Sequence, residues 1–172
     1  MTRYTIIIGI VAVIVVAVIF GNVSCTDQSS KDYTQTIKSD STDASYNKVN
    51  VYNNRGLIYA ALGQYQEAIH DYNQAIELNP TDMNAYYNRG LSWFKLGEYK
   101  QAIWNHKRVI EFGRGDSDVY FSRGLANEML GKYIYALSDF DQALRLDSSN
   151  VLARSGKIRV NQILRDEKRQ IE

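Results

Sequence analysis

The apolar positions of this chain change spacing along its length, and over residues 49–82 they follow the faces of two helices. Between 49 and 62, apolar and small side chains recur every three or four positions, the spacing of one helix face. Residues 65–78 show the same spacing. Gly63 lies between the two segments, where a helix end favours a left-handed residue without a Cβ. The pattern predicts a helical hairpin.

The same pattern returns at an interval of 34 residues. The small residues that recur are Gly56, Gly90 and Gly124 in the first helices, and Ala68, Ala102 and Ala136 in the second. Small side chains at these positions allow the two helix backbones to approach closely. A fixed period of this length predicts a solenoid, in which each hairpin buries its apolar face against its neighbours. We therefore expect three repeats, over residues 49–82, 83–116 and 117–150.

The repeated positions resemble those of the tetratricopeptide repeat (TPR) family, which has aromatic residues, Gly, Ala and Pro at fixed positions. The first repeat matches this pattern completely, with Tyr52, Gly56, Tyr59, Ala68, Tyr72, Ala75 and Pro80. The second repeat departs from it at His106, Val109 and Arg114, and the third at Asn127 and Ser148. The resemblance implies an all-α solenoid of three hairpins.

Residues 151–172 continue the array with a capping helix and a charged tail. Asn150 is placed to cap this helix at its start. The apolar stripe able to cover the third repeat comprises Ala153, Gly156, Val160, Ile163 and Leu164. A charged segment over 165–169 follows, as expected for the outer side of a terminal cap.

Residues 1–24 are strongly apolar and lie outside the repeats. The run from Ile6 to Phe20 contains no polar side chain, and from Tyr4 to Val23 it reaches the roughly 20 residues with which a helix crosses a bilayer. Arg3 precedes the run, as in a signal peptide or signal anchor. The segment predicts an N-terminal hydrophobic helix that enters a membrane, with the repeats on the non-cytoplasmic side.

Cys25, the single cysteine, follows this run directly. Val23-Ser24-Cys25 resembles a bacterial lipobox, in which the cysteine is lipidated and the leader is removed, although Asn22 stands where that pattern has an apolar residue. The sequence is equally consistent with a lipoprotein and with an uncleaved signal anchor, and it favours plain secretion less. Residues 25–48 are polar and typical of a linker that holds the array away from the bilayer.

Charge and chemistry exclude several classes of function. The net charge is +1 and the basic residues are scattered, so we expect no nucleic acid partner. One cysteine and two histidines exclude a disulfide framework and make a structural zinc site unexpected, and we expect no metal and no cofactor. His106 stands where the sister repeats have Tyr72 and Phe140, which predicts a buried core residue. No nucleophile or phosphate-loop motif is present, so we expect no catalytic residues and no enzyme.

Each first helix carries an arginine, and each second helix carries Asp or Asn sixteen positions later. The pairs are Arg55 with Asp71, Arg89 with Asn105, and Arg123 with Asp139. An antiparallel hairpin brings such positions together, giving ion pairs in repeats 1 and 3 and a hydrogen bond in repeat 2. We favour this structural role over a ligand-binding role for the arginines.

The resemblance implies a binding groove on the inner face of the first helices, because that face accepts peptides in TPR proteins. By position, the groove residues are Asn50, Asn53, Leu57, Tyr87, Asn88, Leu91, Phe94, Phe121, Leu125 and Met129. Asparagine can hydrogen-bond a peptide backbone through both its carbonyl and its amide group. Together with the aromatic residues, it favours an extended or helical segment with apolar side chains. Ordinary family packing is the alternative for the aromatic residues.

TPR domains that grip chaperone C-termini resemble one another in a clamp of basic residues and asparagines around a carboxylate. Here only Asn88 matches, while Asp118 and Ser122 stand where that clamp has basic residues, so we expect no such ligand. The sequence thus predicts a membrane-tethered scaffold that binds a protein or peptide partner. The alternative is a structural subunit that self-associates end to end into an oligomer or fibre.

Overall fold

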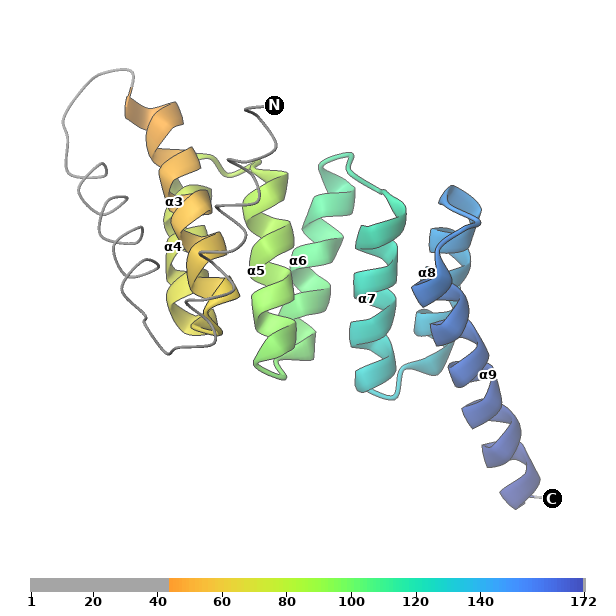
Figure 1. Cartoon of the computed structure of the whole chain (residues 1–172). Coiled ribbons are helices and arrows are strands. Elements are labelled where there is room, and N and C mark those ends of the chain that lie inside the picture. Colours follow the sequence, from red (N-terminus) through yellow and green to blue (C-terminus); the bar gives the residue numbers. More distant parts are fainter. Residues whose placement is uncertain (1–43, 172) are drawn as a thin grey trace, which may run out of the picture.

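Seven helices make up residues 44–171, the part of the chain that the computed structural model describes (Figure 1). They are α3 (Ala44–Ala61), α4 (Tyr65–Leu78), α5 (Met83–Lys95), α6 (Tyr99–Glu111), α7 (Ser117–Met129), α8 (Tyr133–Leu146) and α9 (Val151–Ile171). The predicted fold of three hairpins and a capping helix is confirmed. The hydrophobic segment 1–24, Cys25 and the predicted linker up to residue 43 lie outside the described residues. The last residues of that linker, 44–48, belong to α3, which begins before the predicted start of repeat 1 at residue 49. Among the described helices, none combines the length and the apolar character needed to cross a bilayer.

Each hairpin turns at a glycine whose backbone no other residue adopts easily. Gly63 has a φ of 76°, and Gly97 and Gly131 repeat this left-handed conformation at 80° and 69°. After the first of these glycines, the backbone N–H of Gln64 donates to the carbonyl oxygen of Tyr59 at 2.9 Å, which closes the end of α3. The turns predicted from the sequence are therefore confirmed.

The recurring small residues set the distance between the two helices of a hairpin. A Cβ atom added to Gly56 would lie 2.6 Å from Cε1 of Tyr72, and one added to Gly124 would lie 2.9 Å from Cε1 of Phe140. Ala136, on the facing helix of the third hairpin, is completely buried. Because larger side chains do not fit at these positions, the constant interval of small residues determines how closely the helices pack.

The hairpins stack in chain order and form two layers (Figure 1). The first helices touch one another, α3 with α5 and α5 with α7, whereas no comparable contact joins α4 to α6 or α6 to α8. The second helices are therefore spread apart, and the array bends toward the layer of first helices. We call α3, α5 and α7 the inner layer, and α4, α6 and α8 the outer layer.

The C-terminal end of the array is covered by α9. The side-chain oxygen of Asn150 accepts the backbone N–H of Ala153 at 2.9 Å, as expected for a capping residue. Ala153 and Val160 are completely buried in one cluster with Phe140 of α8. Figure 1 shows the second half of α9 extending beyond the hairpins. The predicted role of this helix as a cap is confirmed for its first half.

Candidate functional site

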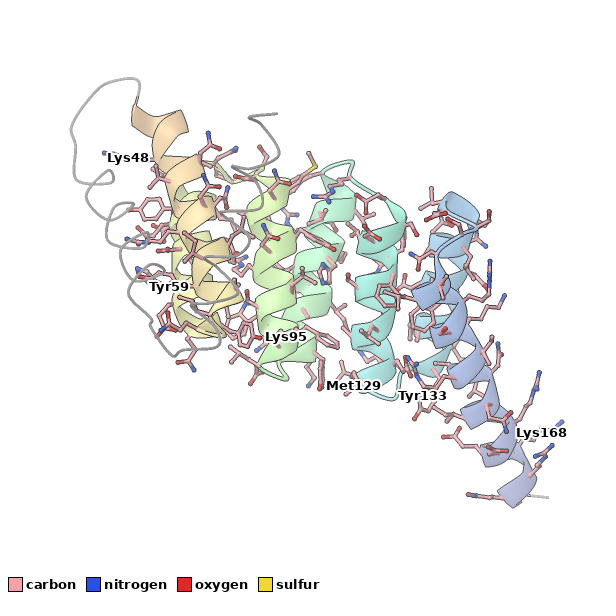
Figure 2. The ribbon with its side chains drawn as sticks, viewed as in Figure 1. Lys48, Tyr59, Lys95, Met129, Tyr133 and Lys168 are labelled. Carbon is pink, nitrogen blue, oxygen red and sulfur yellow. The ribbon has the colours of Figure 1, made fainter. Side chains whose placement is uncertain are left out.

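The predicted groove residues all lie on the inner-layer helices, but they differ in exposure. Asn50, Leu57 and Met129 are exposed. The half-buried members are Tyr87, Asn88, Leu91, Phe94, Phe121 and Leu125. Figure 2 shows Met129 and Lys95 near the same end of the array, where α7 and α5 end. The inner layer thus presents apolar, aromatic and amide side chains on α3, α5 and α7.

Each groove aromatic also packs against a second helix. The ring of Tyr87 lies 5.5 Å from that of His106, and the ring of Phe94 lies 5.2 Å from that of Tyr99. On α7, the ring of Phe121 lies 6.1 Å from that of Phe140. Their half-burial follows from this packing. One part of each ring packs against the neighbouring helix and stabilises the hairpin, as the alternative of ordinary family packing requires. The remaining part of each ring is exposed on the inner layer.

Asn53 differs from the other groove candidates because it is buried. Its Nδ2 donates to Oδ2 of Asp82 at 2.7 Å. The other carboxylate oxygen of Asp82 accepts the backbone N–H groups of Asn84 and Ala85 and so caps α5. Asn53 therefore joins α3 to the start of α5, and it lies beneath the inner surface rather than on it.

Arg114, in the loop between α6 and α7, is a residue that the sequence analysis did not assign to this surface. Its guanidinium lies 4.9 Å from the centre of the Tyr87 ring and donates to the side-chain oxygen of Asn84 at 3.1 Å. It also pairs with Asp116 at 2.8 Å. The loop is thereby attached to one end of α5. The departure of Arg114 from the family pattern was the one feature of the sequence that pointed to a special role for this residue.

The three arginine pairs form within the hairpins, as predicted. Arg55 donates through Nε and Nη2 to the two carboxylate oxygens of Asp71 at 2.6 and 2.5 Å. Arg123 pairs with Asp139 in the same way, with a shortest distance of 2.6 Å. In repeat 2 the Nε of Arg89 donates to the side-chain oxygen of Asn105 at 2.9 Å. The structural role is confirmed for repeats 1 and 3, because both Nε and Nη2 of the arginine donate to the carboxylate of the same hairpin.

Two open pockets lie in the outer layer, where the second helices are spread apart. One, of about 430 Å³, is bounded by Asn73 of α4, Arg89 and Trp93 of α5, and Trp104 of α6. The other, of about 360 Å³, includes Arg123 and lies one repeat further along the chain. These pockets were not predictable from the sequence, because their walls come from different hairpins.

His106 is completely buried, as predicted from its sister residues. Burial, and to a smaller extent the positive charge of Arg123, lower the pKa of His106 to about 4. The imidazole is therefore neutral at pH 7. Within the described part of the chain, no group of His, Cys, Asp and Glu side chains is arranged to hold a metal ion.

Comparison with known proteins identifies the repeat. Residues 56–97 match the family model described as the TPR repeat. The first TPR domain of Spaghetti (RPAP3), solved with the HSP90 peptide SRMEEVD, is 26% identical over 69% of this chain and 94% of that one, with a TM-score of 0.67. The TPR domain of Arabidopsis OM64 is 27% identical over 66% of this chain and 94% of that one, with a TM-score of 0.64.

A further solved structure shares the fold at lower identity. MamA is 24% identical over 83% of this chain and 81% of that one, with a TM-score of 0.73. No curated protein matches the chain significantly. The solved structures agree with the hairpin stack described above.

Proposed function

The chain is a TPR repeat protein, and from this premise we propose that it binds a segment of a partner protein on its inner layer. A TPR array is a scaffold fold and not an enzymatic one, in agreement with the expectation from the sequence. The observation that carries the proposal is the surface of apolar, aromatic and amide side chains on α3, α5 and α7. A curved surface of this kind suits a peptide-like ligand.

The chemistry of the inner layer favours a segment with apolar side chains. Leu57 of α3 is 47% exposed and Met129, the last residue of α7, is 51% exposed. Phe94 of α5 lies half-buried on the helix between them. The amides of Asn50 and Asn88 offer both donors and acceptors to the backbone of such a segment. Burying the apolar side chains against a ligand would supply most of the binding free energy.

An acidic C-terminal peptide fits this surface less well. The first TPR domain of Spaghetti is solved with the HSP90 peptide SRMEEVD, in which three of the last four residues are acidic. In the present chain Asp118 is an exposed anion in the first turn of α7, and Ser122 is buried and uncharged. An anion at this place repels a ligand carboxylate. We therefore propose an apolar segment as the ligand of the inner layer.

The test begins with peptides selected from a random display library against the full chain in detergent. We expect selected sequences with apolar residues, and we expect Phe94→Ala and Met129→Ala each to weaken binding about tenfold or more. Ile134→Ala is the matched control, because Ile134 is 69% exposed on the outer-layer helix α8. Loss of binding in the control, with both inner-layer variants unaffected, would move the site to the other layer.

The membrane tether is a separate part of the proposal and is supported by the sequence alone. The apolar run up to Val23 and the position of Cys25 after it support a signal anchor or a lipoprotein, with the repeats on the non-cytoplasmic side. Intact mass of the protein purified from membranes tests this. A retained leader indicates the anchor, and an acylated chain that begins at Cys25 indicates the lipoprotein. An unmodified chain without residues 1–24, recovered outside the membrane fraction, contradicts both.

Self-association remains the second candidate function, and one observation favours it. The outward face of α9 exposes Val151, Leu152 and Ile158, each by more than 60%. Apolar side chains at the end of an array favour contact with another copy. Sedimentation over a range of protein concentrations tests this candidate, since a monomer at the highest concentration excludes it.

A further inference from the structure

The three arginines at equivalent positions of the repeats differ in charge balance. Asp71 neutralises Arg55 in repeat 1, and Asp139 neutralises Arg123 in repeat 3. In repeat 2 the corresponding residue is Asn105, an uncharged amide. Among the described residues, no carboxylate pairs with Arg89. Repeat 2 therefore keeps a net positive charge at a position where its neighbours are neutral.

Arg89 is held in place while part of its guanidinium stays available. Its Nε donates to Asn105 at 2.9 Å and its Nη1 donates to the side-chain oxygen of Asn73 at 2.5 Å. The aromatic rings of Tyr86 and Trp104 flank it at 5.1 and 5.8 Å. Nη2 forms no hydrogen bond within the described residues, although the equivalent Nη2 atoms bind carboxylate oxygens in the sister repeats.

Burial makes this unpaired charge costly. Desolvation lowers the pKa of Arg89, whereas the hydrogen bond to Asp71 raises the pKa of Arg55. A guanidinium nevertheless stays protonated at pH 7. A half-buried cation without a counter-charge gains more from an anion than an exposed cation does, because the surroundings screen the attraction less. The guanidinium of Arg89 therefore favours binding of an anionic group from another molecule.

The pocket around Arg89 is large enough for such a group. Its volume is about 430 Å³, within the usual range of ligand pockets. Trp93 and Trp104 provide apolar walls, and Lys100 adds a second, exposed positive charge at the edge. The wall residues come from α4, α5 and α6, so the pocket opens on the outer layer, on the side opposite the proposed groove.

We propose that this outer pocket binds a carboxylate side chain of an acidic segment of a partner protein. The sister repeats show which kind of group this edge of the arginine binds, because the carboxylates of Asp71 and Asp139 lie against the same edge of Arg55 and Arg123. One oxygen of the incoming carboxylate accepts from Nη2 of Arg89, and Lys100 adds an attraction at longer range. The tryptophan walls suit an apolar residue beside the acidic one. The site is independent of the inner-layer groove.

The two tryptophans make the pocket observable by fluorescence. Trp93 and Trp104 are the only tryptophans of the chain, and both line this pocket. The probe is a short peptide, acetylated and amidated at its ends, that carries glutamate beside leucine. The control peptide replaces glutamate by glutamine. We expect a saturable change in tryptophan emission with the acidic peptide, weakened by salt, and at least roughly tenfold weaker binding of the glutamine peptide.

Asn105→Asp is the decisive variant, because it supplies inside the protein the carboxylate that repeats 1 and 3 already have. We expect N105D to fold, to keep both tryptophans and to bind the acidic peptide at least roughly tenfold more weakly. Arg89→Gln should also lose binding. Arg108→Gln is its matched control, because Arg108 lies on α6 outside the pocket and pairs with Glu111. R108Q should bind like the unsubstituted protein.

Three results would overturn the proposal. The first is no change in emission up to about 1 mM acidic peptide, the range in which even weak complexes form. The second is an unchanged affinity of N105D, which would separate binding from the charge of Arg89. The third is a response to inorganic phosphate equal to the response to the peptide, which would assign the pocket to free anions instead of a protein partner.

Discussion

At the scale of single residues, the same position of the repeat holds side chains of different chemistry in the three repeats. Tyr72, His106 and Phe140 occupy the same position and are all completely buried. Of these three side chains, only His106 takes up a proton in the acid range, and its ring nitrogens have no hydrogen-bond partner in the described residues. At this position, only the second repeat carries a side chain that becomes charged in acid.

Replacing His106 by phenylalanine, as found in repeat 3, should remove this response. The pKa of His106 is about 4 in the folded protein and about 6.5 in an unfolded chain, so the unfolded state binds the proton first. The contribution of His106 is unaffected above pH 6.5, and stability is lost as the pH falls from about 6.5 to about 4. The full loss is about 3 kcal/mol. Chemical denaturation at pH 7 and pH 4.5 measures most of this loss, about 2.5 kcal/mol.

His70→Phe is the matched control for this comparison, because His70 is exposed on α4. We expect H106F to flatten the difference in stability between the two pH values, and H70F to leave it in place. An equal dependence on pH in H106F and in the unsubstituted protein would show that other groups govern acid unfolding.

At the scale of the helices, the close approach within each hairpin depends on glycine. Alanine normally stabilises a helix by up to about 1 kcal/mol relative to glycine. At Gly124 the added Cβ would lie 3.0 Å from Cβ of Asp139 and 2.9 Å from the ring of Phe140. Since Asp139 is fixed by its ion pair with Arg123, α7 and α8 must move apart.

Gly124→Ala should therefore lower the free energy of unfolding by about 1–3 kcal/mol, the usual cost of inserting a methyl group into a packed core. Urea denaturation followed by circular dichroism measures the change. Ser155→Ala, at an exposed position of α9, tests helix propensity without a close contact. A G124A protein as stable as the unsubstituted one would show that the hairpin has room to adjust.

The cap helix provides a matched pair of valines. Val160 is completely buried against the third hairpin, whereas Val151 is 66% exposed on the same helix. Val160→Ala should cost about 2 kcal/mol, because it removes buried apolar surface and leaves a cavity. Val151→Ala should change stability by less than about 0.5 kcal/mol. Thermal unfolding of the two variants compares them, and equal effects would contradict the role of α9 as a packed cap.

At the scale of the whole molecule, the curvature of the stack separates two surfaces with different chemistry. The inner layer combines apolar and aromatic side chains with amides, and the outer layer opens around Arg89 where the second helices spread apart. A partner with an apolar segment and a nearby acidic segment could engage both layers. Two linked contacts bind more tightly than either alone when the linker spans the distance.

A double substitution tests whether the two surfaces act independently. Phe94→Ala changes the inner layer and Asn105→Asp changes the outer pocket, and the two side chains do not contact each other in any interaction described above. Each variant should weaken only its own peptide, and the double variant should weaken each peptide as much as the corresponding single variant does. Isothermal titration with each peptide measures this. A shared loss in either single variant would show that the surfaces are coupled.

Much of the fold was predictable because it depends on neighbours in the chain. Gly63 and its counterparts mark the turns, and Gly56 faces Tyr72 within one hairpin. The pairing of Arg55 with Asp71 follows from the same antiparallel geometry. The place of the candidate groove residues on the inner helices followed from the family resemblance, but the burial of Asn53 did not.

The sequence by itself determined the helices, their turns, the number of repeats and the partners within each hairpin, because these depend on residues within one repeat. Only the tertiary structure decided which side chains of neighbouring hairpins meet. Asn53 of α3 bonds to Asp82, the capping residue of α5. Arg89 bonds to Asn73 across a repeat boundary, and the pocket around Arg89 arises from the spreading of α4 and α6. The angle between hairpins follows from the packing of all their side chains together, and no local pattern encodes it.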